Sequence, residues 1–122
     1  EGSTHVLDIE GLQDKSIKFW SIYENEALIG CGALKFLDSK HGELKSIRVA
    51  DPFRNRGYGK KIIKVLIEKS RQLNIQKISI ETGSGEFFLP ARKLFKSSGF
   101  AVCKPFSHYD EDPNSCYMSL KL

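Results

Sequence analysis

A run of glycines and basic residues is the segment of this chain best suited to chemistry. It reads Arg54-Asn55-Arg56-Gly57-Tyr58-Gly59-Lys60 and lies between an expected strand and an expected helix. Glycine lets a backbone come close to a ligand, and the amide groups and dipole of a helix N-terminus favour negative charge. Arg54, Arg56 and Lys60 would add charge-assisted contacts at its rim. The run therefore predicts a phosphate-binding loop.

Two familiar phosphate-binding patterns do not match this loop. A P-loop needs G-x-x-x-x-G-K-[ST], and a dinucleotide-binding turn needs a third glycine where this chain has Ile62. A glycine turn whose basic neighbours are coincidental is the other interpretation, because such turns are common.

The elements that must position this loop follow from hydrophobic spacing. Aromatic and β-branched residues around Glu24-Asn25-Glu26 predict a hairpin of strands 17–23 and 27–37. Alternation predicts a strand from Glu43 to Val49, with residues 43, 45, 47 and 49 on one face. Apolar residues at helical spacing then predict an amphipathic helix from Tyr58 to Leu73.

The second half of the chain continues the alternation of strand and helix. The expected elements are a strand at 75–81, a helix at 87–98, a short strand at 100–104 and a final strand ending at Leu122. Pro90 fits the first turn of that helix and Gly99 fits its C-terminal cap. Residues 1–16 are polar and weakly patterned, which predicts a loop or a turn of helix. The strand–helix–strand unit requires a parallel pair inside an otherwise antiparallel sheet.

The order of these motifs resembles the GNAT superfamily of acetyltransferases. Arg54, Gly57 and Gly59 match its R/Q-x-x-G-x-G/A loop, and the segment 91–100 looks like its A-x-x-L-Y-x-x-x-G-F signature. The resemblance covers about residues 17–122, and the segment 105–115 is similar to a subgroup of small bacterial members. It implies an α/β fold (α+β in some schemes), with a mixed, mostly antiparallel sheet and a central parallel strand pair flanked by helices.

The resemblance also implies transfer of an acetyl group from acetyl-coenzyme A to a primary amine of a small molecule or peptide, without a metal. The pyrophosphate would lie on the backbone amides of residues 56–60, which include Tyr58, and Asn55 would also contact the cofactor. Main-chain groups of Ile47, Arg48 and Val49 would face the pantetheine arm and the acetyl carbonyl, where a donor stabilises the oxyanion.

Three side chains are candidates for moving protons in such a reaction. A lysine-like amine is protonated at neutral pH, with a reference pKa of about 10, so a carboxylate must help to remove its proton. Glu43 resembles an acidic residue of some family members, and Glu81 begins the E-T-G sequence of the subgroup. The family tyrosine that protonates the leaving thiolate falls at Phe95, so Tyr109 is the substitute that we consider. The ordinary alternative for Glu43 and Glu81 is an exposed ion pair with a nearby lysine. The ordinary alternative for Tyr109 is a tyrosine packed within its loop.

Two further departures from the family concern the pantetheine site and the N-terminus. An asparagine that often contacts the pantetheine falls at Phe88. The strand and one or two helices that usually precede the hairpin, roughly 25 to 40 residues, are expected to be largely absent. The sheet edge near Ile17 would then be exposed and could pair with another chain, as in a homodimer.

Composition limits the other possibilities. The chain has 122 residues, which indicates one domain over residues 1–122, and no apolar run approaches the roughly 20 residues that cross a membrane. A nucleic-acid-binding domain that uses the basic helix is the weakest alternative, because the net charge is only +4 and the lysines lack interleaved aromatic residues. Its odd number of cysteines suits free thiols in the cytoplasm, and its histidines are expected to be surface residues in loops. An acyl-coenzyme A-binding module without turnover is the alternative function, because Phe95 and the short N-terminus permit it.

Overall fold

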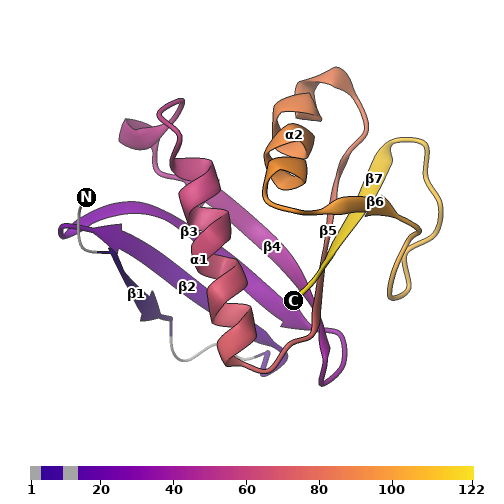
Figure 1. Cartoon of the computed structure of the whole chain (residues 1–122), viewed down its shortest axis with the longest axis horizontal. Helices are drawn as coiled ribbons and strands as arrows, with labels where there is room; N and C mark the ends of the chain where they lie inside the picture. The colour runs from indigo at the N-terminus through magenta and orange to yellow at the C-terminus, as the bar shows by residue number, and fades with distance from the viewer. Residues whose placement is uncertain (1–3, 10–13) are drawn as a thin grey trace.

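The computed structural model describes residues 4–9 and 14–122, which form one sheet with two α-helices against it (Figure 1). In these residues the sheet has seven strands in the order β1-β2-β3-β4-β5-β7-β6. The strands are β1 (Thr4–Asp8), β2 (Ile17–Glu24), β3 (Ala27–Phe36), β4 (His41–Val49), β5 (Lys77–Gly83), β6 (Ala101–Cys103) and β7 (Ser115–Lys121). The helices are α1 (Tyr58–Gln72) and α2 (Leu89–Ser97), with short 3-10 turns at Asp51–Phe53 and Glu86–Phe88.

The expected hairpin, helices and mixed sheet are confirmed. Only β4 and β5 run parallel among the described strands, as the strand–helix–strand unit requires. Asn25 and Glu26 have positive φ angles in the tight turn between β2 and β3. Gly99 follows α2 with φ of 104°, the left-handed conformation expected of a helix C-terminus.

The prediction for residues 1–16 is wrong at Thr4–Asp8. These residues form β1, which pairs antiparallel with β2 from Thr4↔Glu24 to Asp8↔Trp20. β1 therefore covers the edge of β2 from Trp20 to Glu24, and among the described strands it is the outer one on this side of the sheet. Residues 10–13 lie outside the described residues.

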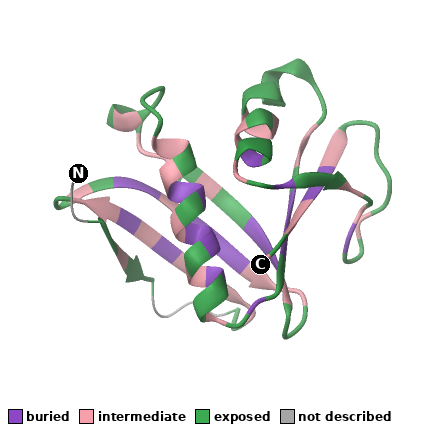
Figure 2. Ribbon diagram, viewed as in Figure 1, coloured by how far each residue is buried: buried purple, intermediate pink, exposed green. Residues whose placement is uncertain are grey.

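Helix α1 packs closely on β3 and β4 because two glycines of β3 make room for it. A Cβ atom at Gly32 would lie 2.5 Å from Leu66 Cδ1, and one at Gly30 would lie 2.3 Å from Ile62 Cδ1. Both helix residues are completely buried, and Figure 2 shows buried positions recurring along α1. The helix is therefore held at a fixed depth on the sheet, which fixes the position of its N-terminus.

A β-bulge in β4 changes which of its residues face the helix. Pairing with β3 shifts between Cys31↔Arg48 and Ala33↔Lys45, and Ser46 has φ of 56°. Leu44 is in the core, and Ile47 and Val49 pack against it, whereas Lys45 is exposed. The expectation that residues 43, 45, 47 and 49 share one face is wrong, because the bulge reverses the alternation at Ser46.

Candidate active site

The strands β4 and β5 separate shortly after they meet. Their parallel pairing runs only from His41↔Lys77 to Glu43↔Ser79. Beyond Glu43, no strand among the described residues pairs with the β5 side of β4, which leaves main-chain groups of residues 44–49 available on that side. Figure 1 shows β4 and β5 diverging from their paired ends towards the loop before α1, and we call this separation of the two strands the opening.

The loop at the start of α1 presents free amides around an open space. Asn55 and Gly57 have left-handed backbones, with φ of 59° and 83°. Among the described residues, no acceptor outside the ladder of α1 binds the N–H groups of residues 56–60, and no side chain caps the helix. A Cβ atom added at Gly57 would meet nothing within 4 Å. A helix N-terminus with free donors and open space suits an anion.

Most of the predicted cofactor residues line one cavity at this loop. The cavity is about 300 Å³ and is lined by Val49, Arg54, Asn55, Gly57, Tyr58, Gly59, Lys60 and Leu94. Leu94, in α2, was not singled out from the sequence. Three predicted residues do not line it: Ile47 packs against the core, Arg48 is exposed, and Arg56 donates from Nη1 to Pro52 O at 3.2 Å.

Contacts with neighbouring elements hold this loop in place. The Tyr58 hydroxyl donates to Glu24 Oε1 at 3.1 Å, and Lys61 forms an ion pair with the same carboxylate. The hydrogen bond from Lys61 lowers the pKa of Glu24 below its usual range, so this anchor persists at neutral pH. Among the described residues, the side chain of Arg54 pairs with Asp51 at 3.5 Å, and this exposed ion pair contributes little.

The three predicted proton-transfer residues lie near one another on the other face of the sheet. Glu43 lies beside Leu44, a core residue, so its side chain points away from the helices. It is 4% exposed, and its Oε2 atom accepts a hydrogen bond of 2.9 Å from the Tyr109 hydroxyl. Glu81 Oε2 accepts one of 2.6 Å from Ser115 Oγ. Burial, and then the hydrogen bond to Glu43, raise the pKa of Tyr109 to about 12, with a further contribution from the charge of Glu81.

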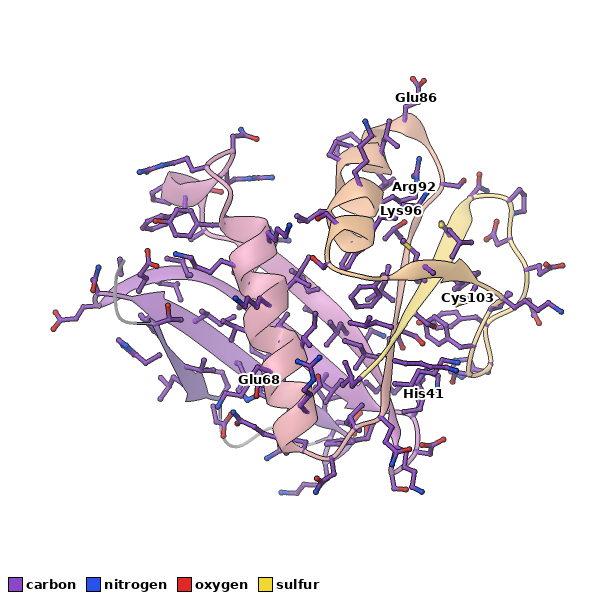
Figure 3. The ribbon with its side chains drawn as sticks, viewed as in Figure 1. His41, Glu68, Glu86, Arg92, Lys96 and Cys103 are labelled. Carbon is purple, nitrogen blue, oxygen red and sulfur yellow. The ribbon has the colours of Figure 1, made fainter. Side chains whose placement is uncertain are left out.

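A row of hydrogen bonds crosses the same face below Glu43. His41 Nε2 lies 2.7 Å from Ser79 Oγ, Ser79 Oγ lies 2.6 Å from Ser119 Oγ, and Ser119 Oγ lies 3.1 Å from Cys103 Sγ. Figure 3 labels His41 and Cys103, the two ends of this row. Ser79 is completely buried, although it alternates in β5 with the core residues Ile78 and Ile80. The sequence offered no signal for this row, because it joins four strands.

His41 is therefore not the surface loop residue that we expected. It lies in β4, is half-buried, and contacts the Phe106 ring with centroids 5.9 Å apart. Burial, and then the charge of Lys77, lower the pKa of His41, while the charges of Asp38 and Glu43 raise it to a smaller extent. The neutral imidazole is the form that suits this position.

We expect protonation of His41 to destabilise the fold. Because its pKa is lowered from 6.5 in the folded chain, the unfolded chain binds more protons just below pH 6.5. Stability should therefore be complete above pH 6.5 and should fall as the pH drops through the folded pKa. Melting temperatures measured against pH would show this decline, and His41→Gln, which cannot titrate, should flatten it. The same decline in the variant would contradict the assignment to His41.

Arg92 of α2 holds the loop that follows β5. Its Nη1 atom donates to Gly83 O at 2.7 Å and to Gly85 O at 2.9 Å (Figure 3). The ring of Phe88 lies against Gly83, where an added Cβ would be 2.2 Å from Phe88 Cδ2. Phe95 is buried against Phe100, with ring centroids 5.2 Å apart. Phe95 is thus a buried packing residue, whereas Phe88 contacts Gly83 with one side of its ring and is 43% exposed.

Two negative observations apply to the described residues. In residues 4–9 and 14–122, no helix is long and apolar enough to span a membrane, and no three His, Cys, Asp or Glu side chains gather as a metal site would require. Cys31, Cys103 and Cys116 are free and partly buried.

Comparisons with known proteins agree with this geometry. Residues 3–100 match the acetyltransferase (GNAT) family. The uncharacterized N-acetyltransferase YsnE of Bacillus subtilis is 46% identical over 98% of this chain and 80% of its own length. A putative acyl-CoA N-acyltransferase from Klebsiella pneumoniae has a TM-score of 0.81 at 22% identity, covering 98% of this chain and 97% of the other.

A GNAT family acetyltransferase from Elizabethkingia anophelis, solved with acetyl-CoA bound, has a TM-score of 0.76 at 21% identity and covers 98% of each chain. The match over residues 3–100, together with the identity to YsnE, establishes more than a shared fold. This chain belongs to the GNAT family of acetyltransferases.

Proposed function

We propose that this acetyltransferase moves an acetyl group from acetyl-coenzyme A to a primary amine of a small molecule or a peptide, by direct attack within a ternary complex. The observation that carries the proposal is the position of two features at the two ends of one opening. The free amides of residues 56–60 lie at the end where α1 begins, and the contact between Glu43 and Tyr109 lies where β4 and β5 separate.

The loop before α1 fits the pyrophosphate of coenzyme A. The space over Gly57 is open, the nearby N–H groups lack partners among the described residues, and Arg54 and Lys60 line the same cavity. Coenzyme A supplies the acetyl group as a thioester, which is activated towards an amine. Main-chain groups of residues 47–49 on the β5 side of β4, where no described strand pairs with them, would hold the pantetheine arm and the acetyl carbonyl.

We assign the removal of the amine proton to Glu43, acting with Tyr109. Glu43 is almost completely buried, and the Tyr109 hydroxyl donates a hydrogen bond to its Oε2 atom. A proton would pass from the amine to Tyr109 Oη as the phenolic proton passes to Glu43. The neutral nitrogen then bonds to the thioester carbon, the carbon–sulfur bond breaks, and the extra proton on the new amide nitrogen is lost to the thiolate or to water. The thiolate leaves without a general acid, as its reference pKa of about 8.5 permits.

The raised pKa of Tyr109 supports this role over the other one that we considered. With a pKa of about 12, the phenol is a weaker acid than ordinary tyrosine, so donation to a thiolate is less favourable. Glu81 stays the second candidate base, because its charge acts on the same phenol. We place the protein in the cytoplasm, where its three free thiols would stay reduced. A homodimer would pair through β1 or β6, the two edge strands among the described residues.

Release of free thiol from acetyl-coenzyme A, measured with a panel of amines, tests the proposal. The panel would contain amino acids, polyamines, aminoglycosides and peptides with free N-termini. We expect release that requires both an amine and the protein, together with an acetylated amine detected by mass. Calorimetric binding of coenzyme A without release for any amine would instead support the acyl-coenzyme A-binding module. No binding at all would reject both.

A further inference from the structure

The segment between β6 and β7, residues 104–114, carries Tyr109 and has no helix or strand. We call this segment the strap. Tyr109 is 66 positions away from Glu43 in the sequence, and the strap must bring its hydroxyl to 2.9 Å from the Glu43 carboxylate. An irregular segment holds a side chain so accurately only if other contacts fix it.

Tyr117 supplies such contacts from the sheet. It lies in β7 between Cys116 and Met118, which face the helices, so its own side chain points to the strap. Tyr117 is 6% exposed, and its hydroxyl donates to Asp110 O at 3.1 Å. The carbonyl that it holds belongs to the residue directly after Tyr109.

The ring of Tyr117 touches the strap as well. Its centroid lies 5.7 Å from that of Tyr109 and 5.6 Å from that of Phe106, which is itself buried. Phe106 contacts Tyr109 edge to face at 5.3 Å, and Tyr109 N donates to Phe106 O at 3.1 Å. The ring of Tyr117 thus supports Tyr109 from the side while its hydroxyl restrains the backbone beyond it.

The other anchor of the strap lies at its far end. Ser84 Oγ donates to Pro113 O at 2.5 Å, and Ser84 N donates to Asn114 O at 3.1 Å. These bonds fix residues 113–114 but not the backbone beside Tyr109. Among the described residues, the Tyr117 hydroxyl is the side-chain donor from the sheet that bonds to the strap backbone directly beside Tyr109.

We infer that Tyr117 is a positioning residue, which acts by holding Tyr109 against Glu43. It does not itself contact the reacting atoms. The inference rests on the proposed function, because it matters to turnover only if Tyr109 and Glu43 move the proton.

The substitution Tyr117→Phe removes the hydroxyl and keeps the ring. Loss of one hydrogen bond of about 1 kcal/mol predicts a fall in kcat of roughly 3- to 10-fold, because the pair spends less time in the productive arrangement. The KM for acetyl-coenzyme A should not change, because the loop at α1 is untouched. Tyr23→Phe, a matched change in β2 outside the strap, should leave kcat as it is.

The double variant with Tyr109→Phe decides whether Tyr117 acts through Tyr109. We expect Tyr109→Phe to lower kcat more than Tyr117→Phe does, and the double variant to be no slower than Tyr109→Phe alone. Losses that multiply in the double variant, or an unchanged kcat in Tyr117→Phe, would overturn the inference. Wild-type kcat in Tyr109→Phe would instead reject the proposed relay, and the dependent role of Tyr117 with it.

Discussion

Replacing Gly57 with glutamate should nearly abolish binding of coenzyme A. The added carboxylate would occupy the open space over residue 57, where a pyrophosphate would meet the free amides of the loop. Placing like charges together costs several kcal/mol, so we expect affinity to fall by roughly 100-fold or more in calorimetry. The fold should survive, because nothing lies within 4 Å of the new Cβ atom and a left-handed residue costs about 1–2 kcal/mol.

Gly85→Glu provides a matched control. Position 85 also has open space around an added Cβ atom, and its φ of −73° is acceptable for any residue. The same charge is therefore added to a loop without a site-forming role in the proposal, and affinity should stay close to that of the wild type. If Gly57→Glu melts normally and binds coenzyme A as tightly as the wild type, the loop does not hold the pyrophosphate.

The loop before α1 could be predicted because its signals are local. The segment Arg54–Lys60 contains two glycines, three basic residues and the start of an amphipathic helix. Each of these features acts on the backbone of the segment itself, so neighbouring residues are enough to interpret it. The structure adds Leu94 as a wall of the same cavity. That contact comes from α2, and no spacing in the sequence fixes how two helices meet.

The faces of β4 could not be predicted, because a single residue reverses them. Ser46 adopts φ of 56°, which usually favours glycine or asparagine. Because no glycine or asparagine marks the bulge, the alternation from Glu43 to Val49 predicts one regular strand. The bulge turns Ile47 and Val49 to the core and leaves Glu43 on the opposite face.

Polar residues that face the strap were missed for a related reason. Ser79 alternates with Ile78 and Ile80, which indicates a strand with one exposed face. The strap covers this face, so Ser79 is buried and its hydroxyl bonds to His41 and Ser119. A strap without regular structure leaves no periodic signal, so neither its position nor the partners beneath it follow from the pattern. Segment 4–8 was missed because a short, exposed edge strand has little hydrophobic alternation.

The argument for Glu43 as the general base depends on its burial as much as on its charge. An exposed carboxylate exchanges protons with water, whereas Glu43 is 4% exposed and is reached through the phenol of Tyr109. An amine that contacts Tyr109 Oη would therefore be connected to one base by a single hydrogen bond. This arrangement lets us separate Glu43 from Glu81, which is exposed and bonded to Ser115.

Replacing Glu43 with glutamine should lower kcat for thiol release by about 100- to 10,000-fold, the usual contribution of a general base. The amide oxygen can still accept the hydrogen bond from Tyr109, so the strap should stay in place and the KM for acetyl-coenzyme A should hold. Glu81→Gln is the matched control and should lose far less activity. A greater loss in Glu81→Gln would move the base to Glu81. Full activity in both variants would mean that neither carboxylate takes the proton.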